Sequence, residues 1–80
     1  MENRRNIYYR PLTVREENVM RLIALGYDNH EIAEKMSIST HTVKAFVANI
    51  LRKLDAKNRT NAVYIALSIG IISDNLMKFN

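Results

Sequence analysis

Four residues of a type that favours helix N-termini divide this chain into short segments: Thr13, Asp28, Ser39 and Asn58. The first two are followed three residues later by Glu16 and Glu31, which completes the capping-box pattern. Apolar residues then recur at three- and four-residue spacing, as they do in helices that bury one face. We therefore predict an all-α fold with four helices.

The predicted core takes one apolar stripe from each helix. The stripes are Val19, Leu22 and Ile23; Ile32, Ala33 and Met36; Val43, Val47, Ile50, Leu51 and Leu54; and Ala62, Ile65, Ala66 and Ile69. Gly26 is expected to end the first helix, and Gly70 followed by Ile71 the last, because glycine adopts the left-handed conformation of a helix C-terminus. Asp55 is expected to end the third helix in the same conformation, which aspartate tolerates better than most residues.

Length and composition exclude most other architectures. Eighty residues make at most one domain, and the chain has two glycines, one proline and no cysteine. It therefore has few sites for tight hairpin turns, and neither a disulfide framework nor a thiolate metal cluster can supplement the core. We divide it into a polar N-terminal arm (residues 1–11), a helical domain (12–72) and a short tail (73–80). No stretch is apolar enough for a signal peptide or a membrane span, so we expect a cytoplasmic protein without a membrane partner.

The positive charge is concentrated in one part of the chain. Residues 37–61 hold five basic side chains and one acidic side chain, which gives this segment the whole net charge of +4. A localised basic stretch is the electrostatic footprint of a nucleic-acid-binding protein. A merely solvated charged surface is the alternative that charge alone leaves open.

A three-residue turn, Ser37-Ile38-Ser39, separates the short second helix from a longer third helix, expected over about Thr40 to Lys53. Such a pair, with supporting helices before and after it, is a helix-turn-helix domain. Opposite its apolar stripe, the third helix carries small, polar and basic residues: His41, Lys44, Ala45, Ala48, Asn49 and Arg52. A DNA major groove is about 12 Å wide and admits one α-helix of this kind.

The free face of the third helix predicts how DNA is read. Lys44 supplies donors for guanine, Ala45 and Ala48 permit close approach of the backbone, and Asn49 could address adenine. Other polar and basic residues are expected to contact phosphates. These are Asn29, Ser39, Thr40, Thr42, Arg52, Lys53, Lys57 and Arg59.

These motifs resemble the LuxR/FixJ/GerE-type DNA-binding domain. The matching residues are Leu12-Thr13, Arg15-Glu16, Asn29, Glu31-Ile32-Ala33, Ile38-Ser39, Thr42-Val43-Lys44, Asn49-Ile50-Leu51, Lys53-Leu54 and Asn58-Arg59, within an ungapped match over about residues 12–72. The resemblance implies a transcriptional regulator that binds inverted-repeat double-stranded DNA as a dimer, with RNA polymerase as a candidate partner. The chain looks like the short stand-alone regulators typified by GerE.

Three positions depart from the family pattern. Phe46 stands where the family usually has histidine, and we expect it to extend the core. Asp55 stands where glycine is usual, which places an acid close to the phosphates. Ala48 replaces a frequent lysine or arginine, so we expect fewer direct base contacts and more dependence on DNA shape.

The fourth helix is apolar beyond its core stripe. Val63, Tyr64 and Leu67 lie outside that stripe in the helical pattern, so we expect a second buried face. We favour a homodimer interface. The alternative is that the N-terminal arm, with Ile7, Tyr8 and Tyr9, or the tail, with Leu76, Met77 and Phe79, covers this face.

Other functional classes have less support. His30 and His41 have no cysteine or carboxylate cluster around them, so no metal or other cofactor is expected, and no catalytic constellation indicates an enzyme. The main rival is an adaptor or anti-activator that binds another regulator through the fourth helix. An adaptor has no reason to keep the basic face around Lys44 and Arg52. An RNA-binding domain ranks last, because the exposed aromatic platform used for base stacking is missing.

Overall fold

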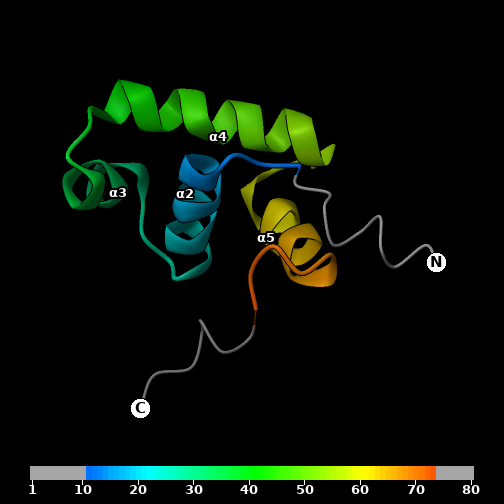
Figure 1. The fold of residues 1–80 in the computed structure, drawn as a ribbon. Helices are drawn as coiled ribbons and strands as arrows, with labels where there is room; N and C mark the ends of the chain where they lie inside the picture. The colour runs from blue at the N-terminus through cyan, green and yellow to red at the C-terminus, as the bar shows by residue number, and fades with distance from the viewer. Residues whose placement is uncertain (1–10, 74–80) are drawn as a thin grey trace, which may run out of the picture.

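The computed structural model describes residues 11–73, in which four α-helices and no strands are found. The helices are α2 (Val14–Ala24), α3 (Asn29–Met36), α4 (Thr40–Leu54) and α5 (Arg59–Ser68). The longest, α4, runs along one side of the domain, and the other three helices lie beneath it (Figure 1). None of the helices in residues 11–73 is long and apolar enough to cross a membrane. The all-α helix-turn-helix prediction is confirmed.

Each helix begins at the residue that the sequence predicts. Thr13 and Asp28 form complete capping boxes, in which the cap side chain accepts a backbone N–H and the glutamate three residues on accepts the N–H of the cap. Ser39 and Asn58 accept the N–H groups of Thr42 and Asn61. These bonds satisfy N–H groups that a helix cannot pair internally, each with an effect of about 1 kcal/mol.

Each helix is followed within two residues by a left-handed residue, and an apolar residue comes directly after it. Gly26 and Gly70 have φ of 97° and 84°, and two non-glycine residues, Ser37 and Asp55, have φ of 58° and 55°. The N–H of the next residue then bonds a carbonyl five positions back, as in Ile71 N–H to Ala66 O at 2.9 Å. The predicted ends at Gly26, Asp55 and Gly70 are confirmed. The left-handed conformation of Ser37 was not predicted.

The core lies where the four helices meet. Fully buried side chains come from each helix and from the segments at both ends of the bundle: Leu12, Val19, Met20, Ile32, Val43, Ile50, Ala62, Ala66 and Ile72. Most of the predicted stripe residues are buried or half-buried against this core. Ile38 packs on it from the turn between α3 and α4.

The structure corrects the prediction for α5. Ile69, expected in the core, is 53% exposed, whereas Ile72 is 3% exposed and contributes to the core instead. The reason is the turn at Gly70, which reverses the chain and brings Ile71 and Ile72 back over the helix. Val63 and Leu67, expected outside the stripe, are half-buried and pack against the core. The face that α5 leaves exposed is thus narrower than the sequence pattern indicates.

Candidate nucleic-acid interface

One face of α4 is fully accessible along its length. Lys44, Ala45, Ala48, Asn49 and Arg52 are all exposed, whereas the opposite face buries Val43, Ile50 and Leu54. In residues 11–73 the ammonium of Lys44 has no hydrogen-bond partner, so its three donors face solvent. Ala45 and Ala48, in the middle of this face, have short side chains and leave the backbone of α4 open to close approach. The four predicted base-reading residues therefore share one surface.

The N-terminus of α4 offers hydroxyl groups and backbone N–H groups together. The Oγ of Ser39 accepts the N–H of Thr42 at 3.0 Å and lies 2.9 Å from the Thr42 hydroxyl. Thr40, at the first helical position, is half-buried. No acidic side chain occupies the first turn of α4, so the partial positive charge of this helix end is not neutralised there.

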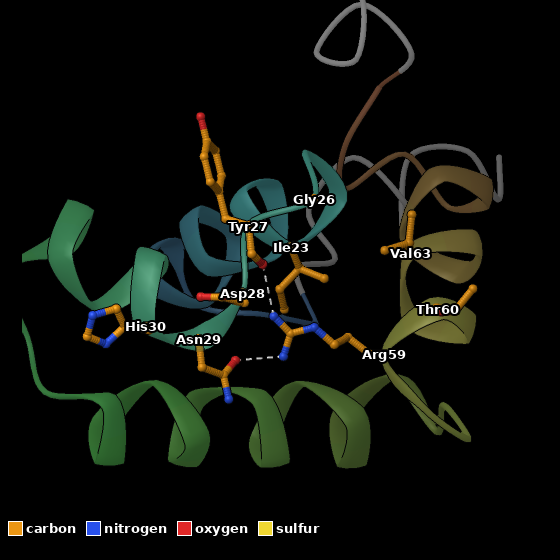
Figure 2. Close-up of a pocket in the computed structure, with 9 residues that line it drawn as sticks. All are labelled: Ile23, Gly26, Tyr27, Asp28, Asn29, His30, Arg59, Thr60 and Val63. Carbon is orange, nitrogen blue, oxygen red and sulfur yellow. Dashed lines mark hydrogen bonds between the residues drawn. The ribbon is translucent and has the colours of Figure 1, made fainter.

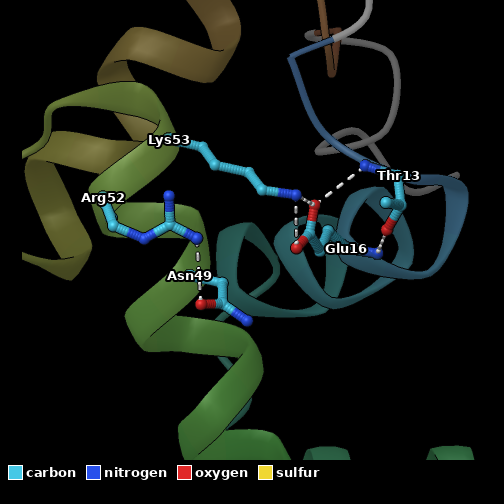
Figure 3. A network of polar contacts seen from close by, with 5 residues as sticks. All are labelled: Thr13, Glu16, Asn49, Arg52 and Lys53. Atoms are coloured by element: carbon cyan, nitrogen blue, oxygen red, sulfur yellow. Dashed lines mark hydrogen bonds and ion pairs between the residues drawn. The ribbon is translucent and has the colours of Figure 1, made fainter.

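At the other end of the face, Arg52 contacts Asn49. The Nη2 of Arg52 donates to the Oδ1 of Asn49 at 3.2 Å, and both side chains are exposed. Figure 3 shows this pair on α4 beside the neighbouring Lys53 contact. The predicted base-reading asparagine and the predicted phosphate-binding arginine are thus joined in one unit.

Lys53 connects α4 to the start of α2. Its Nζ donates to both carboxylate oxygens of Glu16, at 2.9 and 3.0 Å (Figure 3). Glu16 is only 4% exposed and also accepts the backbone N–H of Thr13 at 2.8 Å. The side chain of Lys53 is 29% exposed. Lys53, predicted to bind phosphate, therefore pairs with Glu16 inside the fold. The sequence indicated only a capping role for Glu16.

The hydrogen bonds to Glu16 outweigh the effect of its burial. Burial raises the pKa of this carboxyl group, but the N–H of Thr13 and the ammonium of Lys53 stabilise its charged form. The net result is that the pKa of Glu16 lies below its ordinary value of 4.5. Glu16 is thus charged at neutral pH, and its contact with Lys53 connects α2 to α4.

Arg59 joins the N-terminus of α5 to that of α3. Its Nη1 donates to the Oδ1 of Asn29 at 2.6 Å, and its Nη2 donates to the carbonyl oxygen of Tyr27 at 3.1 Å. The three residues line an open cleft of about 670 Å³ between the start of α3 and α5 (Figure 2). Both Arg59 and Asn29 are half-buried. Two predicted phosphate contacts therefore bind each other.

Lys57 is a predicted phosphate contact that lies outside the helices. It is exposed in the turn between α4 and α5, and its backbone N–H is fixed by the Oδ1 of Asn61 at 2.8 Å. Asn61 in turn donates its own N–H to the Oδ1 of Asn58, also at 2.8 Å. These hydrogen bonds to backbone N–H groups stabilise the turn, and the side chain of Lys57 is exposed.

Phe46 extends the core, as expected from the sequence. It is half-buried against the core, and the guanidinium of Arg15 lies 5.8 Å from the centre of its ring. This distance is within the range of a cation–π contact. Phe46 thus contributes apolar surface to the core and contacts Arg15 of α2.

Three polar contacts could not be found from the sequence. Glu16 with Lys53, and Arg59 with Asn29 and Tyr27, join residues 30 to 37 positions apart. Helical periodicity gives no information at this separation. The contact between Asn49 and Arg52 is different, because their three-residue spacing on a helix would have allowed it to be predicted.

The exposed large apolar residues of α5 and its C-terminal end are Tyr64 and Ile69, which are 69% and 53% exposed. Of the three residues predicted to form a dimer interface, Tyr64 is exposed, and Val63 and Leu67 are half-buried. The residues of the arm and tail proposed to cover this face lie outside the described residues.

The fold and the accessible face of α4 define a helix-turn-helix domain, and sequence comparison assigns its family. The family described as bacterial regulatory proteins of the luxR family, GerE, matches residues 10–66. The chain belongs to this family, which consists of DNA-binding regulators of transcription and is not a class of enzymes.

Similar proteins include longer bacterial regulators. The chain is 45% identical over 62 residues to the uncharacterized transcriptional regulatory protein YvfU of Bacillus subtilis. It is 47% identical over 64 residues to the response regulator protein VraR of Staphylococcus aureus and to that of Staphylococcus epidermidis. These alignments cover 78% and 80% of this chain. The chain spans about 31% of the length of each relative.

Proposed function

We propose that this protein binds double-stranded DNA in a sequence-specific manner, with α4 in the major groove, and thereby regulates transcription. The accessible face of α4 carries the proposal, because its exposed Lys44 and Asn49 flank two exposed alanines while the opposite face is buried. Lysine and asparagine supply the donors that read base edges, and alanine lets the backbone approach them.

Phosphate contacts position the helix in this proposal. The N-terminus of α4 with Ser39 and Thr42 lies at one end of the face, and the exposed Lys57 lies beyond the other end. Such contacts contribute much of the affinity and little of the specificity. Lys53 and Arg59 keep their structural partners: Lys53 acts mainly by holding α4 to α2, and Arg59 by holding α5 to the start of α3.

The test is a gel-shift titration with random duplex DNA over a range of salt concentrations, followed by selection of the bound sequences. We expect salt-dependent binding and enrichment of one motif. The matched variant is Ala48→Glu, which places an acid on the exposed face without disturbing the core, and it should abolish binding while the helical content is retained. Failure of the wild-type protein to bind any duplex would contradict the proposal.

We further propose that two copies of the chain form a dimer on DNA. One reading helix contacts few base pairs, so a dimer on an inverted repeat supplies the second helix, about 34 Å away along the DNA. Tyr64, at 69% exposure, is the centre of the proposed interface, with Val63 and Leu67 beside it. An interface on one short helix is small, so we expect it to be weak without DNA.

Tyr64→Asp tests the dimer better than a change at Leu67, because Leu67 packs on the core and its replacement would also affect folding. We expect the variant to keep the thermal stability of the parent and to lose cooperative occupancy of two half-sites. Equal cooperativity in the variant would exclude this surface as the interface. If Tyr64→Asp instead lost binding to another regulator but kept DNA binding, α5 would serve an adaptor role.

A further inference from the structure

We propose that Arg52 and Asn49 form a donor-only pair that reads guanine, so that Asn49 does not read adenine. This inference rests on the proposed function, since it concerns which base α4 selects. Its basis is the hydrogen bond from the Nη2 of Arg52 to the Oδ1 of Asn49, 3.2 Å long, one helical turn apart on the exposed face of α4. Figure 3 shows the amide nitrogen of Asn49 turned away from Arg52.

The chemistry of the guanidinium group determines the orientation of the amide. A guanidinium has five N–H donors and no acceptor, so it can bind only the oxygen of the asparagine side chain. The amide nitrogen, which has two N–H donors, must then face the opposite direction. The contact therefore determines which hydrogen-bonding group Asn49 presents beyond the helix.

An asparagine held in this way is poorly suited to adenine. Recognition of adenine requires both ends of the amide, because the oxygen accepts from N6 and the nitrogen donates to N7. Here the oxygen is engaged by Arg52, and the positive charge beside it disfavours the approach of another donor. The two N–H groups of Asn49 and the remaining N–H groups of Arg52 form a surface of donors only.

Guanine is the base that matches such a surface. Its major-groove edge presents two acceptors, N7 and O6, whereas adenine presents one acceptor and one donor, and cytosine presents a donor. No acidic side chain is present on the exposed face of α4 between Lys44 and Arg52 to disrupt this arrangement. The pair thus converts an adenine-type side chain into a guanine-reading one, with Arg52 as the residue that determines the specificity.

The experiment compares binding sites selected from a random duplex library by four proteins: the parent, Asn49→Ala, Arg52→Met and Lys57→Met. Asn49→Ala identifies the base pair that Asn49 reads, as the position that loses its preference. We expect guanine there in the parent, preferred over adenine by about fivefold or more. Arg52→Met frees the amide oxygen, so the preference should shift toward adenine at that position.

Lys57→Met is the matched control, because it removes one exposed positive charge at a distance from Asn49 and should weaken binding without a change of base preference. Adenine at the mapped position in the parent, or an unchanged preference in Arg52→Met, would overturn the inference. So would an Asn49→Ala variant with the same preferences as the parent. If the parent protein bound no DNA at all, this result would instead contradict the proposed function itself.

Discussion

Replacement of Glu16 by glutamine should measure how strongly α4 is held to α2. The substitution keeps an oxygen that can accept the N–H of Thr13 but removes the negative charge that binds Lys53. A hydrogen bond to a charged group contributes about 1.5–3 kcal/mol, and an exposed ion pair about 0–1 kcal/mol. Because Glu16 is only 4% exposed and the lysine side chain 29% exposed, the pair is closer to the first case than to the second, and we expect a loss of about 2 kcal/mol in the free energy of unfolding.

The assay is urea denaturation followed by circular dichroism at pH 7, with a thermal melt as a second measurement. A loss of about 2 kcal/mol corresponds to a decrease of about 8–16 °C in Tm for a domain of this size. Lys53→Met is the matched variant, because it keeps the aliphatic part of the side chain and leaves the buried carboxylate without its cation. The double variant completes a cycle that isolates the energy of the pair.

The pH dependence of this effect has a definite sign. The pKa of Glu16 is lowered in the folded protein, so the stability it provides is complete above the ordinary value of 4.5 and is lost as the pH falls through the lowered pKa. The parent and Glu16→Gln should therefore differ at pH 7 and converge in strongly acidic solution. A difference below about 0.5 kcal/mol at pH 7 would refute the reasoning, since that is within the range of ordinary surface substitutions. So would a difference that persists unchanged in acid.

Three further substitutions test the DNA contacts and the turn after α4. Lys57→Ala should weaken binding to all DNA sequences alike and reduce the slope of log K against log salt by about one unit, whereas a loss confined to one sequence would indicate base reading. Lys44→Ala should cost about 1–3 kcal/mol on the selected site and much less on random DNA, as measured by competition gel shift; equal losses would make Lys44 a phosphate contact. Asp55→Gly should raise the free energy of unfolding by about 1 kcal/mol in urea, because glycine adopts a φ of 55° without strain, and a decrease would contradict this view of the turn.

Local signals in the sequence predicted most of the fold. The cap residues Thr13, Asp28, Ser39 and Asn58 each begin a helix, because capping depends only on a residue and its neighbours within one turn. The left-handed end at Asp55 follows from the same kind of local chemistry. Ser37 could not be identified in this way, since serine has no special preference for that conformation.

The side on which α5 is buried depends on contacts that helical periodicity does not contain. The turn at Gly70 places Ile72 in the core and leaves Ile69 exposed, although Ile69 fits the apolar repeat of the helix. Which residues follow a turn can be read from the sequence, but whether they fold back onto the helix depends on the space left by the other elements. The partial burial of Val63 and Leu67 against the core likewise cannot be read from the spacing of apolar residues in α5.

The candidate interface was predictable as a surface but not as a set of interactions. Lys44, Ala45, Ala48 and Asn49 lie together on α4 because helical spacing determines which residues share a face. The roles of Lys53 and Arg59 depend on Glu16, Asn29 and Tyr27, which other elements bring close. Charge alone therefore does not separate cations that bind phosphate from cations that stabilise the fold.

Replacement of each guanine of the selected site in turn by 7-deazaguanine tests whether α4 reads bases in the major groove. This base lacks the N7 acceptor of the major groove and keeps the minor-groove edge unchanged. We expect at least one replacement in each half-site to lower the affinity by about fivefold or more. Lys44→Ala or Asn49→Ala should be insensitive at that same position. Unchanged affinity after every replacement would show that the protein does not read guanine from the major groove.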